Sequence, residues 1–208
     1  MSGLPLIMKT ISVESEFKIK EKGSLFIGLS LPVNYEEEAI NLLNSTKKKY
    51  YDATHHCFSY KLAEGLFKYS DDGEPSGTAG IRIYNAQNHY ELSNLITIVV
   101  RYFGGTKLGV GPLGKAYYEA ALQNLDASTI VTKELHQEIT FEYKFEQTKF
   151  IHHLVNKYNL IIKNTQYESN PSMQCSIKTA RLSDMLIELK EGNNPDLRLS
   201  VSENSYYL

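Results

Sequence analysis

The 208-residue sequence predicts a mixed α+β protein built of two domains. Segments in which apolar and polar residues alternate, as in half-buried strands, are interspersed with segments of helical period. The pattern of predicted elements changes near Asp126-Ala127-Ser128, and the segments beyond these residues follow the order βαββαβ. We therefore expect one domain over residues 1–128 and a second over residues 129–208.

The first domain is expected to contain a β-sheet with helices. Its strands end at turn-forming residues such as Pro32 and Glu64-Gly65. Acidic residues 36–38 and lysines 47–49 stand at opposite ends of the first helical segment, where each sign suits the helix dipole. An almost continuous β-branched run predicts a central strand buried on both faces. The expected strands are Ile11–Lys20, Leu25–Leu31, Cys57–Leu62, Leu66–Tyr69 and the central Leu95–Phe103, and the expected helices are 34–49, Ala79–Asn88 and Pro112–Leu125.

The second domain is expected to have the ferredoxin-like fold, because its elements follow the order of the split βαβ motif. The expected strands are His136–Phe145, Leu160–Tyr167, Met173–Thr179 and Leu197–Val201, and the expected helices are Thr148–Tyr158 and Leu182–Leu189.

The composition excludes several classes of protein. The net charge is −2 and neither half of the chain is basic, so a nucleic-acid site has to be a local patch. Cys57 and Cys175 lack CxxC spacing, which predicts two buried free thiols in a reducing compartment, the cytoplasm. No segment resembles a signal peptide or is long enough to cross a membrane. We expect no metal, no cofactor, no membrane contact and no DNA partner.

A glycine-rich loop follows the central strand and leads into a helix. Gly109 to Gly114 match GxGxxG, but the turn is too long and Asp126 too near for a dinucleotide fingerprint. What remains is a set of backbone N–H groups at a helix start, which is a generic anion site. The alternative is that the glycines only allow a tight turn. The candidate residues are Arg101, Gly104, Gly105, Lys107, Gly109, Gly111 and Lys115.

A second loop, residues 70–80, carries three carboxylates: Asp71, Asp72 and Glu74. Oxygen ligands at this spacing suit a hard cation, and the same residues are equally typical of turns and helix caps. Nearby, His55 and His56 precede Cys57 at a strand entrance. Neighbouring residues on a strand point to opposite faces, so His56 and Cys57 do not form a catalytic pair. No catalytic residue is assigned.

Three blocks of sequence resemble the signature blocks of the IMPACT/YigZ family. They read ATHHCFSY from Ala53, SDDGEPSGTAG from Ser70 and VVRYFGGTKLGVGPLGKAY from Val99. The family pattern has glycine and arginine where this chain has Pro112 and Lys115. Lysine keeps the charge at residue 115 but loses the planar fork of arginine.

The resemblance implies a fold and a functional context. It implies an N-terminal sheet with two helices, as in a small-subunit ribosomal protein and elongation factor G, and a C-terminal domain resembling another domain of that factor. Eukaryotic relatives regulate translation initiation by binding a partner that activates an initiation-factor kinase. On this basis we expect a non-enzymatic binding protein that contacts RNA or a ribosome-associated partner.

Two other functions stay open. One is a phosphate- or nucleotide-binding enzyme that uses both loops, with a metal held by the carboxylates. The other is a protein-interaction module, which explains the fifteen tyrosines best. In every case we expect the two loops to lie side by side and form the functional surface, with His55 or His56 at its edge.

Overall fold

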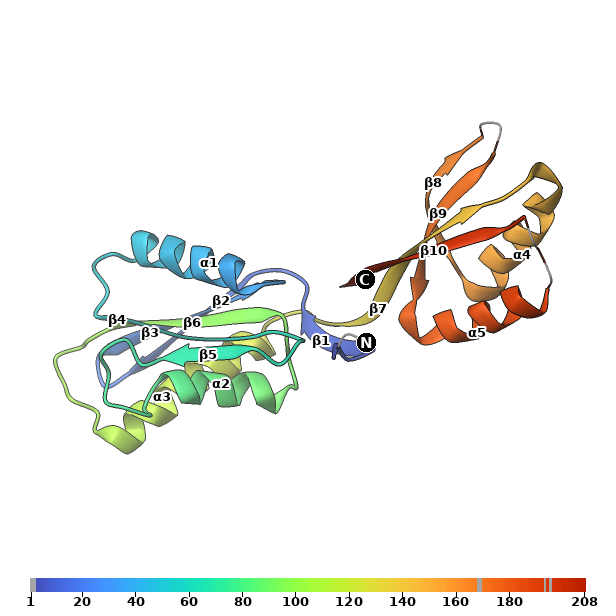
Figure 1. Cartoon of the computed structure of the whole chain (residues 1–208). Coiled ribbons are helices and arrows are strands. Elements are labelled where there is room, and N and C mark those ends of the chain that lie inside the picture. The colour runs from blue at the N-terminus through green and yellow to red at the C-terminus, as the bar shows by residue number, and fades with distance from the viewer. Residues whose placement is uncertain (1–2, 168–169, 193, 195) are drawn as a thin grey trace. The chain divides into compact units, whose positions relative to one another are not determined.

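The computed structural model describes residues 3–167, 170–192, 194 and 196–208. The fold class is mixed α+β with antiparallel sheets, as predicted (Figure 1). Contacts between residues divide the chain into two compact units. One contains Met8–Thr132, and the other contains Lys133–Leu208 together with Leu4–Ile7. The sequence pattern did not indicate that Leu4–Ile7 joins the second unit, and the division at residue 128 into separate domains stays a prediction.

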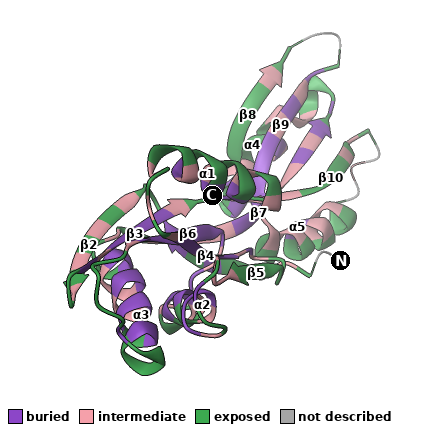
Figure 2. Cartoon of the chain, turned by 90° about the vertical axis from the view of Figure 1, so that its left-hand side faces the viewer, coloured by how far each residue is buried: buried purple, intermediate pink, exposed green. Residues whose placement is uncertain are grey.

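The first unit is built on a five-stranded sheet in which all neighbouring strands run antiparallel. The central strand β6 (Leu95–Tyr102) is buried at every residue but its last, which confirms the predicted buried run (Figure 2). Pairing in register sets Arg101 of β6 opposite His55 on one neighbouring strand and Phe26 on the other. The strand order is β2 (Ser15–Glu21), β3 (Ser24–Pro32), β6, β4 (His55–Lys61) and β5 (Phe67–Ser70).

Helices cover both faces of this sheet (Figure 1). Helix α1 (Glu36–Lys49) packs on one face, and α2 (Gly80–His89) and α3 (Val110–Asp126) pack on the other. Alternate residues of one strand therefore enter different cores: Cys57 joins the core under α2 and α3, and Tyr60 joins the core under α1. The family resemblance implied two helices, and the structure adds a third on the opposite face.

The second unit is ferredoxin-like, as predicted. Its elements are β7 (Ile130–Glu142), a 3-10 turn (Phe145–Gln147), α4 (Thr148–Tyr158), β8 (Ile161–Gln166), β9 (Ser172–Lys178), α5 (Thr179–Glu191) and β10 (Arg198–Tyr207). The hydrogen-bonded order β10-β7-β9-β8 is the arrangement expected of a βαββαβ chain. Residues of α4 and α5 share one core with alternate residues of β7 and β9. Strand β1 (Ile7–Ile11) is also a neighbour of β7 in the hydrogen-bonded order.

Several predicted element boundaries were wrong, and pairing between distant segments explains two of them. Strand β7 begins at Ile130 rather than His136, and its neighbours in the sheet include the distant β1. Strand β10 continues to Tyr207 rather than Val201 because its end pairs with residues 135–137 of β7. The expected single strand Ile11–Lys20 is two strands, β1 and β2, separated by a bend. Helix α3 begins at Val110, two residues before the predicted Pro112.

Candidate functional site

A cavity of about 370 Å³ opens at the end of β4 and β6 where the two glycine-containing loops meet. Both loops contribute to its wall, with Glu74 and Pro75 from one and Lys107 to Gly109 from the other. His55 and Arg101 line it from the strands β4 and β6. The lining residues are Thr54, His55, Glu74, Pro75, Arg101, Phe103, Lys107, Leu108, Gly109, Val110 and Leu113. We call this cavity the loop pocket.

A buried ion pair forms the floor of the loop pocket. The Arg101 guanidinium donates to the Glu74 carboxylate at 2.6 Å, and the two side chains are only 6% and 4% exposed. Tyr117 donates its hydroxyl to the same Glu74 oxygen at 2.7 Å. Ser24 accepts from Arg101 at 3.3 Å. Among the described residues the buried Nε of Arg101 has no partner, so the floor retains one unsatisfied donor.

His55 stands at the rim of the loop pocket with a defined ring orientation. Its Nδ1 lies 2.8 Å from the backbone carbonyl oxygen of Asp72, and a carbonyl oxygen can only accept, so Nδ1 carries a proton. The opposite nitrogen, Nε2, lies 3.8 Å from the Glu74 carboxylate. His56 faces the other side of the sheet, where its Nε2 lies 2.9 Å from the Tyr50 carbonyl oxygen. The strand alternation predicted from the sequence is therefore observed.

The carboxylates of the first loop bind groups within the protein. Asp71 accepts three backbone N–H groups, from Gly77, Ala79 and Gly80, at 2.8–2.9 Å. It thereby joins the loop to the start of α2. Asp72 accepts the backbone N–H of His56 at 2.7 Å and pairs with Lys47 at 3.0 Å. These contacts match the structural interpretation of the loop, in which the carboxylates hold a turn. Among the residues that the structure describes, no three His, Cys, Asp or Glu are grouped to hold a metal ion.

The second loop differs from the first in the contacts of its polar groups. Helix α3 has no side-chain cap at Gly109, which has φ +84, and the next two residues, Val110 and Gly111, are exposed. Lys107 is exposed and takes part in none of the ion pairs found among the described residues. Gly104 is required by packing, because a Cβ there would come within 1.9 Å of the Gly23 backbone. The start of the loop is held by this close backbone contact and by the Gly104 N–H, which donates to Ser24 Oγ at 3.1 Å. Lys107, farther along the loop, is left exposed.

Phe103 adds a flat apolar surface beside these donors. Its ring centroid lies 5.5 Å from the Arg101 guanidinium carbon, which also lies 5.3 Å from the Phe26 ring. The Phe103 ring is still 45% exposed, so it can stack with a planar ligand. Phe103 is not among the site residues predicted from the sequence. An aromatic residue directly before a glycine pair, at the end of a buried strand, was the available signal.

The structure brings only some of the sequence candidates together in the loop pocket. His55, Glu74, Arg101, Lys107 and Gly109 line it. The other candidates stand elsewhere: His56, Asp71, Asp72, Gly104, Gly105, Gly111 and Lys115 are not among the lining residues. Lys115 lines a different hollow, between α3 and β2.

The buried thiol beside the pocket is not suited to nucleophilic chemistry. Burial raises the pKa of Cys57, and nearby carboxylates add to the rise, so the thiol stays protonated. Its Sγ donates to the Asp71 carbonyl oxygen at 3.0 Å. Burial also raises the pKa of Tyr117, which keeps that hydroxyl a donor to Glu74.

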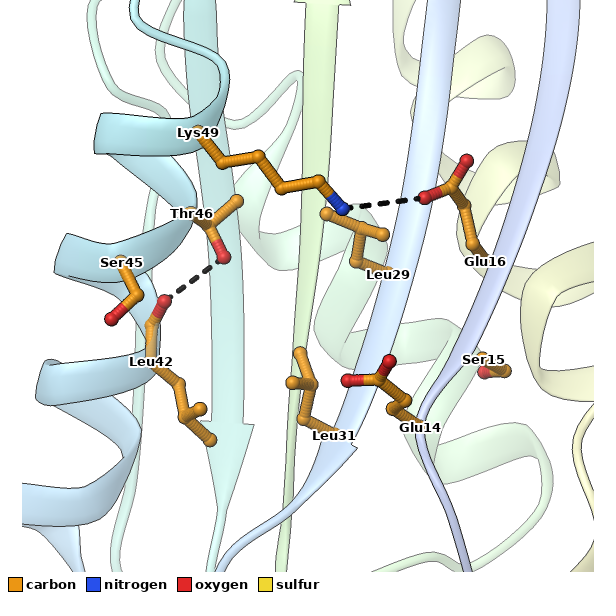
Figure 3. Close-up of a pocket in the computed structure, with 9 residues that line it drawn as sticks. All are labelled: Glu14, Ser15, Glu16, Leu29, Leu31, Leu42, Ser45, Thr46 and Lys49. Carbon is orange, nitrogen blue, oxygen red and sulfur yellow. Dashed lines mark hydrogen bonds and ion pairs between the residues drawn. The ribbon is translucent and has the colours of Figure 1, made fainter.

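A second hollow of about 280 Å³ lies between α1 and strands β2 and β3 (Figure 3). Leu29, Leu31 and Leu42 line it, and at its rim Lys49 pairs with Glu16 at 3.9 Å. Neither glycine-containing loop contributes to this hollow. Because both loops line the loop pocket and neither lines this hollow, we take the loop pocket as the candidate site.

Comparisons with known proteins support the recognition of the three sequence blocks. The family model described as the Impact N-terminal domain matches residues 22–125. IMPACT family member YvyE of Bacillus subtilis is 29% identical over 190 residues, covering 89% of this chain and 88% of the relative. An IMPACT family member of Thermus thermophilus is 33% identical over 137 residues, covering 66% and 74%. A crystal structure of a hypothetical protein superposes with TM-score 0.68 at 26% identity, covering 97% of this chain and all of that one.

Proposed function

This chain belongs to the IMPACT family, and we propose that it is a binding protein of translation regulation that contacts RNA through the loop pocket. The observation that carries the proposal is the open second loop, where Lys107 and the uncapped start of α3 stand beside the exposed ring of Phe103. A phosphate suits the cation and the helix start, and a base suits the ring.

The overall charge of the chain restricts the proposed contact to a small area. The formal net charge is −2, so the protein does not track a long phosphate backbone. Glu74 neutralises Arg101 at the pocket floor, which leaves Lys107 as the exposed cation of the lining. A contact with one or two nucleotides of a single-stranded segment fits this charge pattern better than a duplex groove.

A cytoplasmic location is part of the proposal. Both cysteines are free and buried, which suits a reducing compartment. Among the described residues, no helix is long and apolar enough to span a membrane.

The test is RNA binding by matched lysine variants. Binding of a labelled single-stranded RNA is measured by fluorescence anisotropy at two salt concentrations, for the native chain and for Lys107→Ala and Lys115→Ala. We expect Lys107→Ala to weaken binding about tenfold and to reduce the salt slope by about one. Lys115→Ala is the control, because it removes the same charge from a neighbouring hollow.

Two outcomes contradict the proposal. Absence of RNA binding by the native chain at low salt removes the nucleic-acid contact. Equal weakening by both lysine variants moves the contact away from the loop pocket. The double variant of Lys107 and Lys115 should keep its melting temperature, since neither lysine is in an ion pair found among the described residues. Strong destabilisation would mean that these charges serve the fold.

The enzyme alternative is tested with the same protein. A thermal-shift series with nucleotides and divalent ions detects a small-molecule ligand as a rise of several degrees. The contacts of Asp71 and Asp72 favour a structural role, because their oxygens already accept donors from the protein. Such a rise with a nucleotide and a metal together would favour the enzyme over the RNA-binding protein.

A further inference from the structure

The edge strand β5 exposes an unusual run of large apolar side chains. Leu66, Phe67 and Tyr69 are 40%, 47% and 43% exposed, on and directly before the outermost strand of the first unit's sheet (Figure 2). Sheet edges in soluble proteins are usually protected by charges, proline or a covering segment. Here a single lysine, Lys68, interrupts the apolar run.

The aromatic side chains form a stacked cluster. Phe67 and Tyr69 are paired with Lys61 and Ser59 of β4, so they share the face of the sheet on which α2 packs. The ring of Tyr84 from α2 stacks on Phe67 with centroids 4.8 Å apart and lies 6.4 Å from Tyr69. Packing against a helix holds these rings in place, so a partner meets a preformed aromatic surface. We call Phe67, Tyr69 and Tyr84 the aromatic shelf.

The backbone beside the shelf has unused hydrogen-bonding capacity. Strand β5 pairs with β4 along one side and is the last strand in the order of the sheet. Every second residue of an edge strand points its N–H and C=O groups outward. An extended segment can therefore pair with β5 and place its alternate side chains over the shelf.

The charge of Lys68 indicates which kind of segment can pair with β5. Lys68 is exposed on the face opposite the shelf and is in none of the ion pairs found among the described residues. A carboxylate directly opposite it in an added strand is stabilising, and a like charge is destabilising. If β5 of a second copy paired antiparallel with β5 and both shelves lay on the same face, Phe67 of one copy would stand opposite Tyr69 of the other. The two Lys68 side chains would then stand opposite each other. Self-pairing is therefore disfavoured.

We propose that β5 accepts an extended acidic segment of a partner protein as an added strand, with apolar side chains over the aromatic shelf and a carboxylate opposite Lys68. This surface is separate from the loop pocket. The pocket stands at the His55 end of β4, and the shelf stands at its Lys61 end. The inference does not depend on RNA binding.

The experiment uses the full chain and blocked synthetic peptides of alternating valine and tyrosine with one central glutamate or one central lysine. Hydrogen exchange of the amides of residues 67–70 and peptide titration by NMR are the readouts. We expect the glutamate peptide to protect those of these amides that point away from β4, and the Lys68→Glu variant to bind it about tenfold more weakly. The lysine peptide should show the reverse preference, binding the variant better than the native chain.

A second pair of variants tests the shelf. Phe67→Ser should weaken the glutamate peptide several-fold, and Tyr51→Ser should not, although Tyr51 is an even more exposed aromatic residue at 83%. Should Phe67→Ser fail to fold, the charge exchange at Lys68 remains decisive because that side chain is exposed.

Three results would overturn the proposal. These are no protection of residues 67–70 by the glutamate peptide, peptide affinity that ignores the charge at residue 68, and dimerisation of the native chain through β5 in sedimentation analysis. RNA binding and its dependence on Lys107 are measured independently, so failure of either proposal leaves the other in place.

Discussion

The two glycine-containing loops differ in how far the protein itself satisfies their polar groups. In the first loop, Asp71 caps the start of α2, Asp72 joins β4 to α1 and Glu74 neutralises Arg101. In the second loop the start of α3 has no side-chain cap, and Lys107 is outside every ion pair found among the described residues. The first loop is stabilised by internal contacts, whereas the second is where we propose that a ligand binds. Changes to the carboxylates of the first loop should therefore affect stability, and a change of Lys107 in the second loop should affect binding.

The largest expected effect comes from breaking the buried pair at the pocket floor. Glu74→Ala leaves Arg101 buried without its counter-charge and should lower the free energy of unfolding by about 3–5 kcal/mol. Urea unfolding followed by circular dichroism measures the loss. Glu64→Ala is the matched control, because Glu64 is exposed in the β4–β5 turn. A loss below about 1 kcal/mol for Glu74→Ala would mean that the ion pair is not structural.

The next effect tests the cap of α2. Asp71→Ala removes the acceptor of three backbone N–H groups and should cost about 2–3 kcal/mol. Asp184→Ala on the exposed side of α5 controls for the loss of a carboxylate, and should change stability by less than about 0.5 kcal/mol. Equal stability of the two variants would refute the assigned cap.

A pair of glycines sharpens the comparison within the second loop. Gly109 has φ +84 and ψ 158, a conformation that residues with a Cβ avoid, so Gly109→Ala should cost about 1–3 kcal/mol. Gly111 lies inside α3 with open space around it, so Gly111→Ala should be neutral or stabilising by up to about 1 kcal/mol. Both values come from urea unfolding. The reverse ranking would contradict the described start of α3.

The smallest effect concerns thiol reactivity. Burial raises the pKa of Cys57 beyond its ordinary range and that of Cys175 to about 11. A raised pKa keeps each group as the neutral thiol at pH 8, where the reactive thiolate is scarce. Neither cysteine should react with Ellman's reagent until the chain unfolds. Rapid reaction of one thiol in the folded native chain would contradict this.

The sequence predicted the elements better than it predicted their ends or their partners. The continuous apolar run of β6 identified the central strand, because a strand buried on both faces has no polar alternation. The last residues of β10 were missed because they form a strand by pairing with residues 135–137 of β7, which lies far away in the sequence. The first residues of β7 were also missed, and they belong to a strand whose neighbours include the distant β1. The glycines and charged residues of the two loops could be found from the sequence. The carboxylate that pairs with Arg101 could not be identified in that way. That carboxylate is Glu74, and not Asp71 or Asp72.

The sequence by itself determined the α+β class, the family and the two loops that meet at the candidate site. These follow from local periodicity and from continuous blocks of residues, which a linear sequence records directly. Only the tertiary structure decided that Phe103 and His55 stand at the pocket while His56 and Lys115 do not. The side of a sheet on which a residue lies, and the partner it meets there, depend on strand register and helix packing between segments far apart in the chain.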